Sequence, residues 1–134
     1  MRKPVLCEVD ERGDPIRLFK FRKKAFQYPV ESVNEFPYAF AVEMIRKKVF
    51  ARAGCTPHQA GQCEWCGATI IWEKGYPLSG HLHEKVARGK MTFQNTDNEY
   101  SIENSVAICS DCHIGPNGAH KNRSWHTAKL TKET

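Results

Sequence analysis

Two Cys-x-x-Cys pairs constrain the fold of this chain more than any other feature of its sequence. They supply four of the six cysteines in the chain. Each pair lets two thiolates reach one ion from a tight turn, and two pairs complete the tetrahedral sulfur site that structural Zn²⁺ prefers. We therefore predict one closed, structural zinc site, whose ligands are Cys63, Cys66, Cys109 and Cys112.

Paired cysteines have two other common uses, a redox motif and disulfides. A redox pair normally precedes a helix in a thioredoxin-like βαβ unit, and that context is missing here. The apolar stretch that follows Met1-Arg2-Lys3-Pro4 runs only from Val5 to Cys7, which is too short for a signal peptide, and no apolar run approaches the roughly 18 residues that span a membrane. We therefore expect a cytoplasmic protein without membrane association, in which disulfides are rare. Cys7 and Cys55 are expected to be buried or incidental thiols without a role at the metal site.

Composition and charge point to a soluble globular protein with an excess of basic residues. The chain has 134 residues, 26% of them charged, and a formal net charge of +5, which is the size of one ordinary domain. Clustered Lys and Arg side chains suit a polyanion such as DNA, but they equally suit a solvated basic face. The clusters are residues 20–24 and 46–48, then Arg88 with Lys90, and Lys121 with Arg123.

The first part of the chain predicts a β-hairpin followed by a helix. Residues 4–21 alternate apolar and polar positions around a turn rich in Asp, Gly and Pro. Residues 22–37 are basic and then irregular. Residues 38–53 have apolar side chains at helical spacing, and Gly54 is well placed to end the helix. The apolar positions of this helix are Phe40, Met44, Ile45 and Val49.

The second part of the chain predicts shorter elements. Residues 68–72 and 78–84 are expected to be two strands of a hairpin, joined by a turn over 73–77. Residues 87–101 are polar and predict a loop. Residues 102–113 predict a short extended piece that leads into a helix.

Histidine and asparagine side chains accompany the cysteine pairs in a definite order. His81, His83 and Glu84 lie at the end of the second predicted strand, Asn104 follows, and His113 comes directly after the last cysteine. The ordered set resembles the HNH endonuclease family, in the subgroup braced by two Cys-x-x-Cys pairs. The segments that carry the resemblance are Cys63-Glu-Trp-Cys66-Gly67, His83-Glu84, Glu103-Asn104 and Cys109-Ser-Asp-Cys112-His113.

The resemblance covers about residues 50–126 and implies a small α+β fold. Its core would be the ββα-metal arrangement, in which a two-stranded hairpin and a loop precede the helix that carries the last ligand. We accordingly expect an N-terminal hairpin and basic helix over residues 1–54, the nuclease core over 55–126 and a polar tail over 127–134. Small free-standing proteins of this kind resemble those of phages and mobile elements.

The resemblance also implies an activity, the metal-dependent hydrolysis of DNA phosphodiester bonds by nicking or double-strand cleavage. Such cleavage needs a base that activates water and a cation beside the scissile phosphate. The cation would be Mg²⁺, or Mn²⁺ or Ni²⁺, which tolerate imidazole ligands. By resemblance, His113 is a ligand of this catalytic metal and Asn104 fixes the loop and the catalytic strand end.

The first member of the motif leaves two assignments open. In one, His83 is the general base and Glu84 or His81 helps to hold the metal. In the other, His83 binds the metal and Glu84 is the base. On a strand, His81 and His83 point to one face and Glu84 to the other. The first assignment is favoured, because a carboxylate at its normal pKa is a weak base.

Two other functions fit the cysteine pairs, a non-catalytic zinc-ribbon module that binds DNA and a zinc protein that only docks other proteins. Neither needs the set of His83, Asn104 and His113, which therefore discriminates between the hypotheses. For the nuclease we expect nucleic-acid contacts from four basic residues, which are Arg88, Lys90, Lys121 and Arg123.

Overall fold

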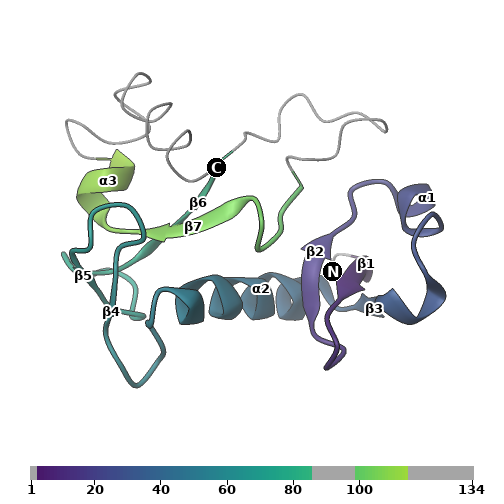
Figure 1. Cartoon of the computed structure of the whole chain (residues 1–134), viewed down its shortest axis with the longest axis horizontal. Coiled ribbons are helices and arrows are strands. Elements are labelled where there is room, and N and C mark those ends of the chain that lie inside the picture. The colour runs from purple at the N-terminus through teal and green to yellow at the C-terminus, as the bar shows by residue number, and fades with distance from the viewer. Residues whose placement is uncertain (1–2, 86–98, 115–134) are drawn as a thin grey trace. The chain divides into compact units, whose positions relative to one another are not determined.

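The computed structural model describes residues 3–85 and 99–114 of a small α+β protein (Figure 1). None of the helices in this described part is long and apolar enough to cross a lipid bilayer. The elements, in chain order, are β1 (Val5–Val9), β2 (Pro15–Leu18), α1 (Arg22–Ala25), the 3₁₀ turn η1 (Val30–Ser32), β3 (Val33–Phe36), α2 (Tyr38–Arg52), β4 (Gly61–Gln62), β5 (Thr69–Ile70), β6 (His81–Glu84), β7 (Ser105–Ile108) and α3 (Ser110–Ile114).

Two compact units make up the chain, and each is assembled from two separate segments. The first unit comprises Met1–Lys48 and Val86–Ser105, and the second comprises Val49–Lys85 and Val106–Thr134. The contiguous division into residues 1–54 and 55–126 that we expected from the sequence remains a prediction.

The first unit contains a three-stranded antiparallel sheet with the strand order β2-β1-β3. The hairpin predicted over residues 4–21 is confirmed by β1 and β2. Its turn is stabilised by the Asp10 carboxylate, which accepts backbone N–H bonds from Arg12 and Asp14 at 3.0 Å each, and by Gly13, whose φ of 85° suits a residue without a Cβ. The Lys48 ammonium lies 3.0 Å from Asp10 and 3.1 Å from Asp14.

The third strand, β3, and the short helix α1 lie where the sequence predicted irregular chain. Residues 33–36 are too few to produce a clear alternation, and Asn34 and Glu35 are both exposed. They form a strand because β1 offers an open edge, to which Val33 and Phe36 pair at opposite ends. A partner distant in sequence therefore decides the structure of this segment.

The helix predicted over residues 38–53 is confirmed as α2. It ends as expected at Gly54, which has φ of 77°, and the Cys55 N–H bonds to the Phe50 carbonyl at 2.9 Å, as in a Schellman C-cap. One part of the predicted apolar face is wrong, because Phe40 is 48% exposed. It stacks on Phe36 at a ring distance of 5.7 Å, while the buried positions of the helix include Ala41, Ile45, Val49 and Phe50.

The second unit contains two small sheets. Strands β5 and β6 lie within the predicted ranges 68–72 and 78–84, but the hairpin pairing predicted between them is wrong, because the bridge that joins the two segments, between Ile71 and Ser79, is parallel. Strand β5 pairs with β4, and β6 pairs with β7. The reason is the tight turn at the first cysteine pair, where the Cys63 N–H bonds to the Ala68 carbonyl at 2.7 Å and folds the chain back early. The extended piece and helix predicted over 102–113 are confirmed by β7 and α3.

The core of the second unit forms where α2 ends. Phe50 is fully buried and contacts Trp72 edge to face at 5.4 Å between ring centroids. A Cβ atom added to Gly80 would lie 2.6 Å from the Phe50 ring and 3.2 Å from Ile70, so the backbone before β6 packs directly on this ring. Strand β7 is buried along its whole length. These contacts fix the base of the strand that carries His81 and His83.

We predict that Phe50→Leu destabilises the protein by about 1–3 kcal/mol, because the smaller side chain leaves a cavity against Trp72 and Gly80. The matched control is Phe40→Leu on the same helix, which should cost less than about 0.5 kcal/mol because this ring is half exposed. Urea denaturation would measure both. Equal losses for the two variants would contradict this description of the core.

Candidate metal centre and histidine cluster

The four paired cysteines converge on one point in the second unit. The sulfur atoms of Cys63, Cys66, Cys109 and Cys112 all lie within 4.8 Å of one another, and Cys66 Sγ and Cys109 Sγ are 3.6 Å apart. Four ligands at the usual Zn–S bond length of about 2.3 Å would be separated by about 3.8 Å in a tetrahedron. This cluster can therefore hold a structural metal such as zinc.

The backbone of each cysteine pair is arranged to support sulfur ligands. The Cys66 N–H points to Cys63 Sγ at 3.4 Å, and the Cys112 N–H points to Cys109 Sγ at 3.5 Å. Burial acts to raise the pKa of Cys63, but the backbone N–H groups of Cys66, Cys109 and Trp65 outweigh it and lower that pKa. Burial raises the pKa of Cys112, so a metal at this cluster must displace a proton there.

Glu64, inside the first cysteine pair, connects the turn of this pair to the end of α2 and to β7. Its carboxylate accepts two bonds from the Arg52 guanidinium at 2.8 and 2.9 Å. It also accepts the backbone N–H of Ala107, in β7, at 2.8 Å, while its own N–H bonds to the Ala107 carbonyl at 2.9 Å. Glu64 was not among the site residues predicted from the sequence, although an acidic residue between two metal-binding cysteines was a visible signal.

Three histidines gather beside the cysteine cluster. His81 and His83 lie on β6, and His113 lies on α3, which begins within the second cysteine pair. The Nδ1 atoms of His81 and His113 are 2.9 Å apart, and the rings of His83 and His113 are 5.3 Å apart. His83 is 7% exposed, and its ring also contacts Trp65 edge to face at 5.6 Å. Two segments distant in sequence thus bring three imidazoles together.

The other predicted catalytic residues occupy different places. Glu84 is half buried at the end of β6. Asn104 belongs to the first unit and directly precedes β7. It is buried, its N–H bonds to Ser101 Oγ at 3.1 Å, and its side-chain amide donates to the Glu99 carbonyl at 3.4 Å. The four predicted nucleic-acid contacts lie outside the described residues, and they are Arg88, Lys90, Lys121 and Arg123.

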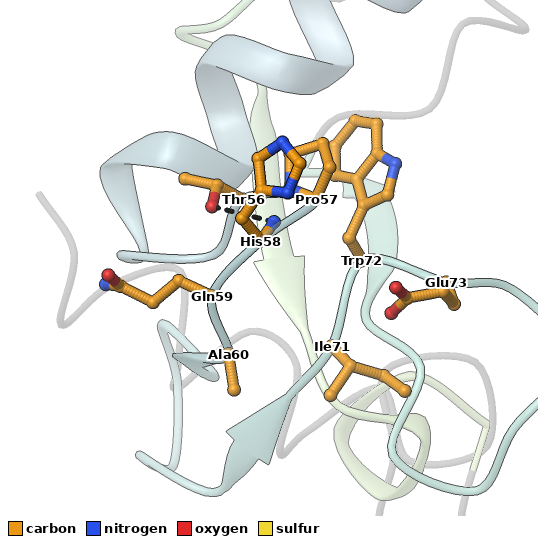
Figure 2. Close-up of a pocket in the computed structure, with 8 residues that line it drawn as sticks. All are labelled: Thr56, Pro57, His58, Gln59, Ala60, Ile71, Trp72 and Glu73. Carbon is orange, nitrogen blue, oxygen red and sulfur yellow. Dashed lines mark hydrogen bonds between the residues drawn. The ribbon is translucent and has the colours of Figure 1, made fainter.

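A pocket elsewhere in the second unit contains none of these three histidines. Figure 2 shows its lining, which comes from the loop after α2 and from the segment that follows β5. His58 lies on the loop, where its backbone N–H bonds to Thr56 Oγ1 at 3.2 Å, and Trp72 lies on the second segment. His58 is exposed and is a useful reference histidine outside the cluster.

Comparisons of the chain with protein-family models, with curated proteins and with solved structures found no match.

We predict that the purified protein contains one zinc ion per chain and that Cys109→Ser loses it, because three sulfur ligands bind the ion more weakly than four. The second unit should then unfold, since its short elements converge on this cluster. Elemental analysis and circular dichroism would measure the two effects. The matched control is Cys55→Ser, which removes a buried thiol outside the cluster and should retain zinc. Zinc that persists in Cys109→Ser would contradict the assignment.

We predict that Glu64→Ala costs more stability than Arg52→Ala. The first variant leaves the buried N–H of Ala107 without its acceptor, which costs about 1–3 kcal/mol. The second removes only a partly exposed ion pair, which contributes less than about 1 kcal/mol. Chemical denaturation with zinc present would separate the two. Equal costs would mean that the ion pair, and not the link to β7, carries the effect.

Proposed function

We propose that this chain is an HNH-type nuclease that hydrolyses DNA phosphodiester bonds with the help of a divalent metal. The observation that carries the proposal is the histidine cluster of His81, His83 and His113. A protein that needed only a structural zinc would have no use for three imidazoles gathered beside the cysteines, on the strand and the helix that the motif predicts.

The order of the elements around the cluster supports the same proposal. Strand β6, strand β7 and helix α3 follow one another in the chain, and β6 pairs with β7. In the ββα-metal arrangement, the first strand carries the base, the helix carries the last metal ligand and the asparagine lies between them. His83, Asn104 and His113 occupy this order on β6, directly before β7 and on α3.

His81 and His113 fit the role of a ligand pair for the catalytic metal. Two nitrogen ligands at bond lengths of about 2.1 Å, at right angles around one ion, would be about 3 Å apart. Their Nδ1 atoms are 2.9 Å apart. Both side chains are half buried, so their imidazoles are partly desolvated and still accessible. A divalent ion held there would supply positive charge beside the scissile phosphate and the departing 3′ oxygen.

His83 fits the role of the general base. Its ring is held between Trp65 and His113 by edge-to-face contacts at 5.6 and 5.3 Å. These contacts fix the orientation of the imidazole, which favours proton transfer along one direction. His83 would take the proton of the attacking water as that water bonds to phosphorus, and the products would be a 5′-phosphate and a 3′-hydroxyl.

Glu84 is the alternative base, and its place on the strand argues against it. Successive side chains on β6 point to opposite faces, so Glu84 faces away from the side shared by His81 and His83. Its carboxylate would need to reach around the strand to meet a water beside His113. We therefore assign the base to His83 and keep Glu84 as the residue to compare.

We predict that His83→Ala lowers the rate of plasmid cleavage in Mg²⁺, Mn²⁺ or Ni²⁺ by about 10²–10⁴-fold, the range of a lost general base. Metal affinity should be unchanged in this variant. His81→Ala and His113→Ala should lose both cleavage and affinity for the catalytic metal, because each removes a ligand. Cleavage rates and metal titration by calorimetry would separate the two classes of residue.

The matched controls for these variants are His58→Ala and Glu84→Gln, both of which should cleave DNA nearly as well as the unaltered protein. Undiminished cleavage by His83→Ala and His113→Ala would refute the site. A protein that binds DNA tightly but never cleaves it would be a zinc-ribbon binding module. A protein that does neither, while retaining zinc, would be a protein-docking module.

A further inference from the structure

We propose that the N-terminal three-stranded sheet positions Asn104, and that Arg17 and Glu99 are positioning residues that connect the sheet to the asparagine. The inference rests on the proposed function, because it assigns a role in catalysis to a region without family resemblance. All of the contacts that carry it lie within the first unit.

The segment over residues 99–104 is attached to β2 through backbone hydrogen bonds. The Leu18 N–H bonds to the Tyr100 carbonyl at 2.9 Å, and the Ile102 N–H bonds to the Ile16 carbonyl at 3.1 Å. Between them, Arg17 and Ser101 form an antiparallel bridge. The segment before Asn104 thus continues the sheet beyond β2, so its backbone is aligned by a hairpin more than eighty residues away in the chain.

Side chains reinforce the attachment of the segment over residues 99–104 to the sheet. The Arg17 guanidinium contacts three carboxylates, with N–O distances of 3.1 Å to Glu8, 3.3 Å to Glu99 and 3.1 Å to Glu103. Glu8 lies on β1 of the sheet, whereas the other two lie on the segment. The carboxylate of Glu99 also accepts the backbone N–H of Lys20 at 3.0 Å. The Arg17 guanidinium therefore connects β1 of the sheet to both Glu99 and Glu103 of the segment.

The contact between Arg17 and Glu99 is buried, which distinguishes it from surface ion pairs. The Glu99 side chain is 1% exposed and the Arg17 side chain 14% exposed. Burial raises the pKa of Glu99, while the backbone N–H of Lys20 and the Arg17 guanidinium oppose the shift. Removing the guanidinium would leave a buried carboxyl group without its charged partner, which is far more costly than the loss of an exposed pair.

Asn104 depends on the same segment for its own hydrogen bonds. Its N–H is held by Ser101 Oγ, and its side-chain amide donates to the backbone carbonyl of Glu99. Glu99 therefore holds Asn104 through its carbonyl and is itself held by Arg17 and Lys20 through its carboxylate. A loss of the Arg17 contact should displace Asn104, and displacements of about 1 Å can lower the rate of an enzyme by up to about a hundredfold.

The test is DNA cleavage by Arg17→Met, alone and combined with Asn104→Ala. We expect Arg17→Met to lower kcat by about tenfold or more with little change in KM, because the chemical step and not substrate binding is disturbed. In the Asn104→Ala background the same substitution should have little further effect. Arg17→Lys, which keeps the charge, should recover part of the loss and serves as the second variant if Arg17→Met folds poorly.

The matched control is Asp14→Asn, which removes an ion pair with Lys48 at the other end of the same hairpin and should leave kcat unchanged.

Hydrogen exchange gives a readout independent of activity: in Arg17→Met, exchange of the Ile102 and Asn104 amides should rise by about tenfold or more. A kcat loss in the double variant equal to the product of the single losses would overturn the inference. Amide exchange that stays unchanged in Arg17→Met would also overturn the inference. If the unaltered protein cleaves no DNA while amide exchange rises in Arg17→Met, only the proposed nuclease function would be refuted.

Discussion

The convergence of four cysteine sulfurs is the constraint on which the second unit depends. Its strands β4 and β5 have two residues each, and helix α3 has five. Elements of this length are not stable alone in water. The cysteine cluster joins the turn between β4 and β5 to the start of α3, and Glu64 extends the connection to β7 and α2. The strand and the helix that carry the three histidines are thereby held against one another.

The longer and more local elements could be predicted from the sequence. The hairpin over residues 4–21 and the helix over 38–53 have their own turn and end signals, and both are present. Strand β3 and the pairing of β6 could not be predicted, because each depends on a partner far along the chain. The exposed ring of Phe40 was misread for a related reason, since a ring at helical spacing can stack on Phe36 instead of entering the core.

The candidate site could likewise be predicted only in part from the sequence. Fixed spacing was enough to predict that Cys63, Cys66, Cys109 and Cys112 would meet, and they do. Motif order alone could not say whether His81 or Glu84 accompanies His113. The alternation of side chains on the predicted strand already separated His81 from Glu84, but the 2.9 Å separation of the His81 and His113 Nδ1 atoms could not be predicted, because these residues lie far apart in the chain.

Each unit is assembled from two segments that are far apart in the chain, and this arrangement has a consequence for folding. The contact between Arg17 and Glu99 spans 82 residues, so residues 99–104 cannot join the N-terminal sheet until synthesis of the chain has passed them. Contacts of such long range slow folding, because the ends of a large loop must meet before any stabilising contact forms. Because the segments of the two units alternate along the chain, the first unit cannot be completed before the first segment of the second unit has been made, and the two should not fold one after the other as independent domains do.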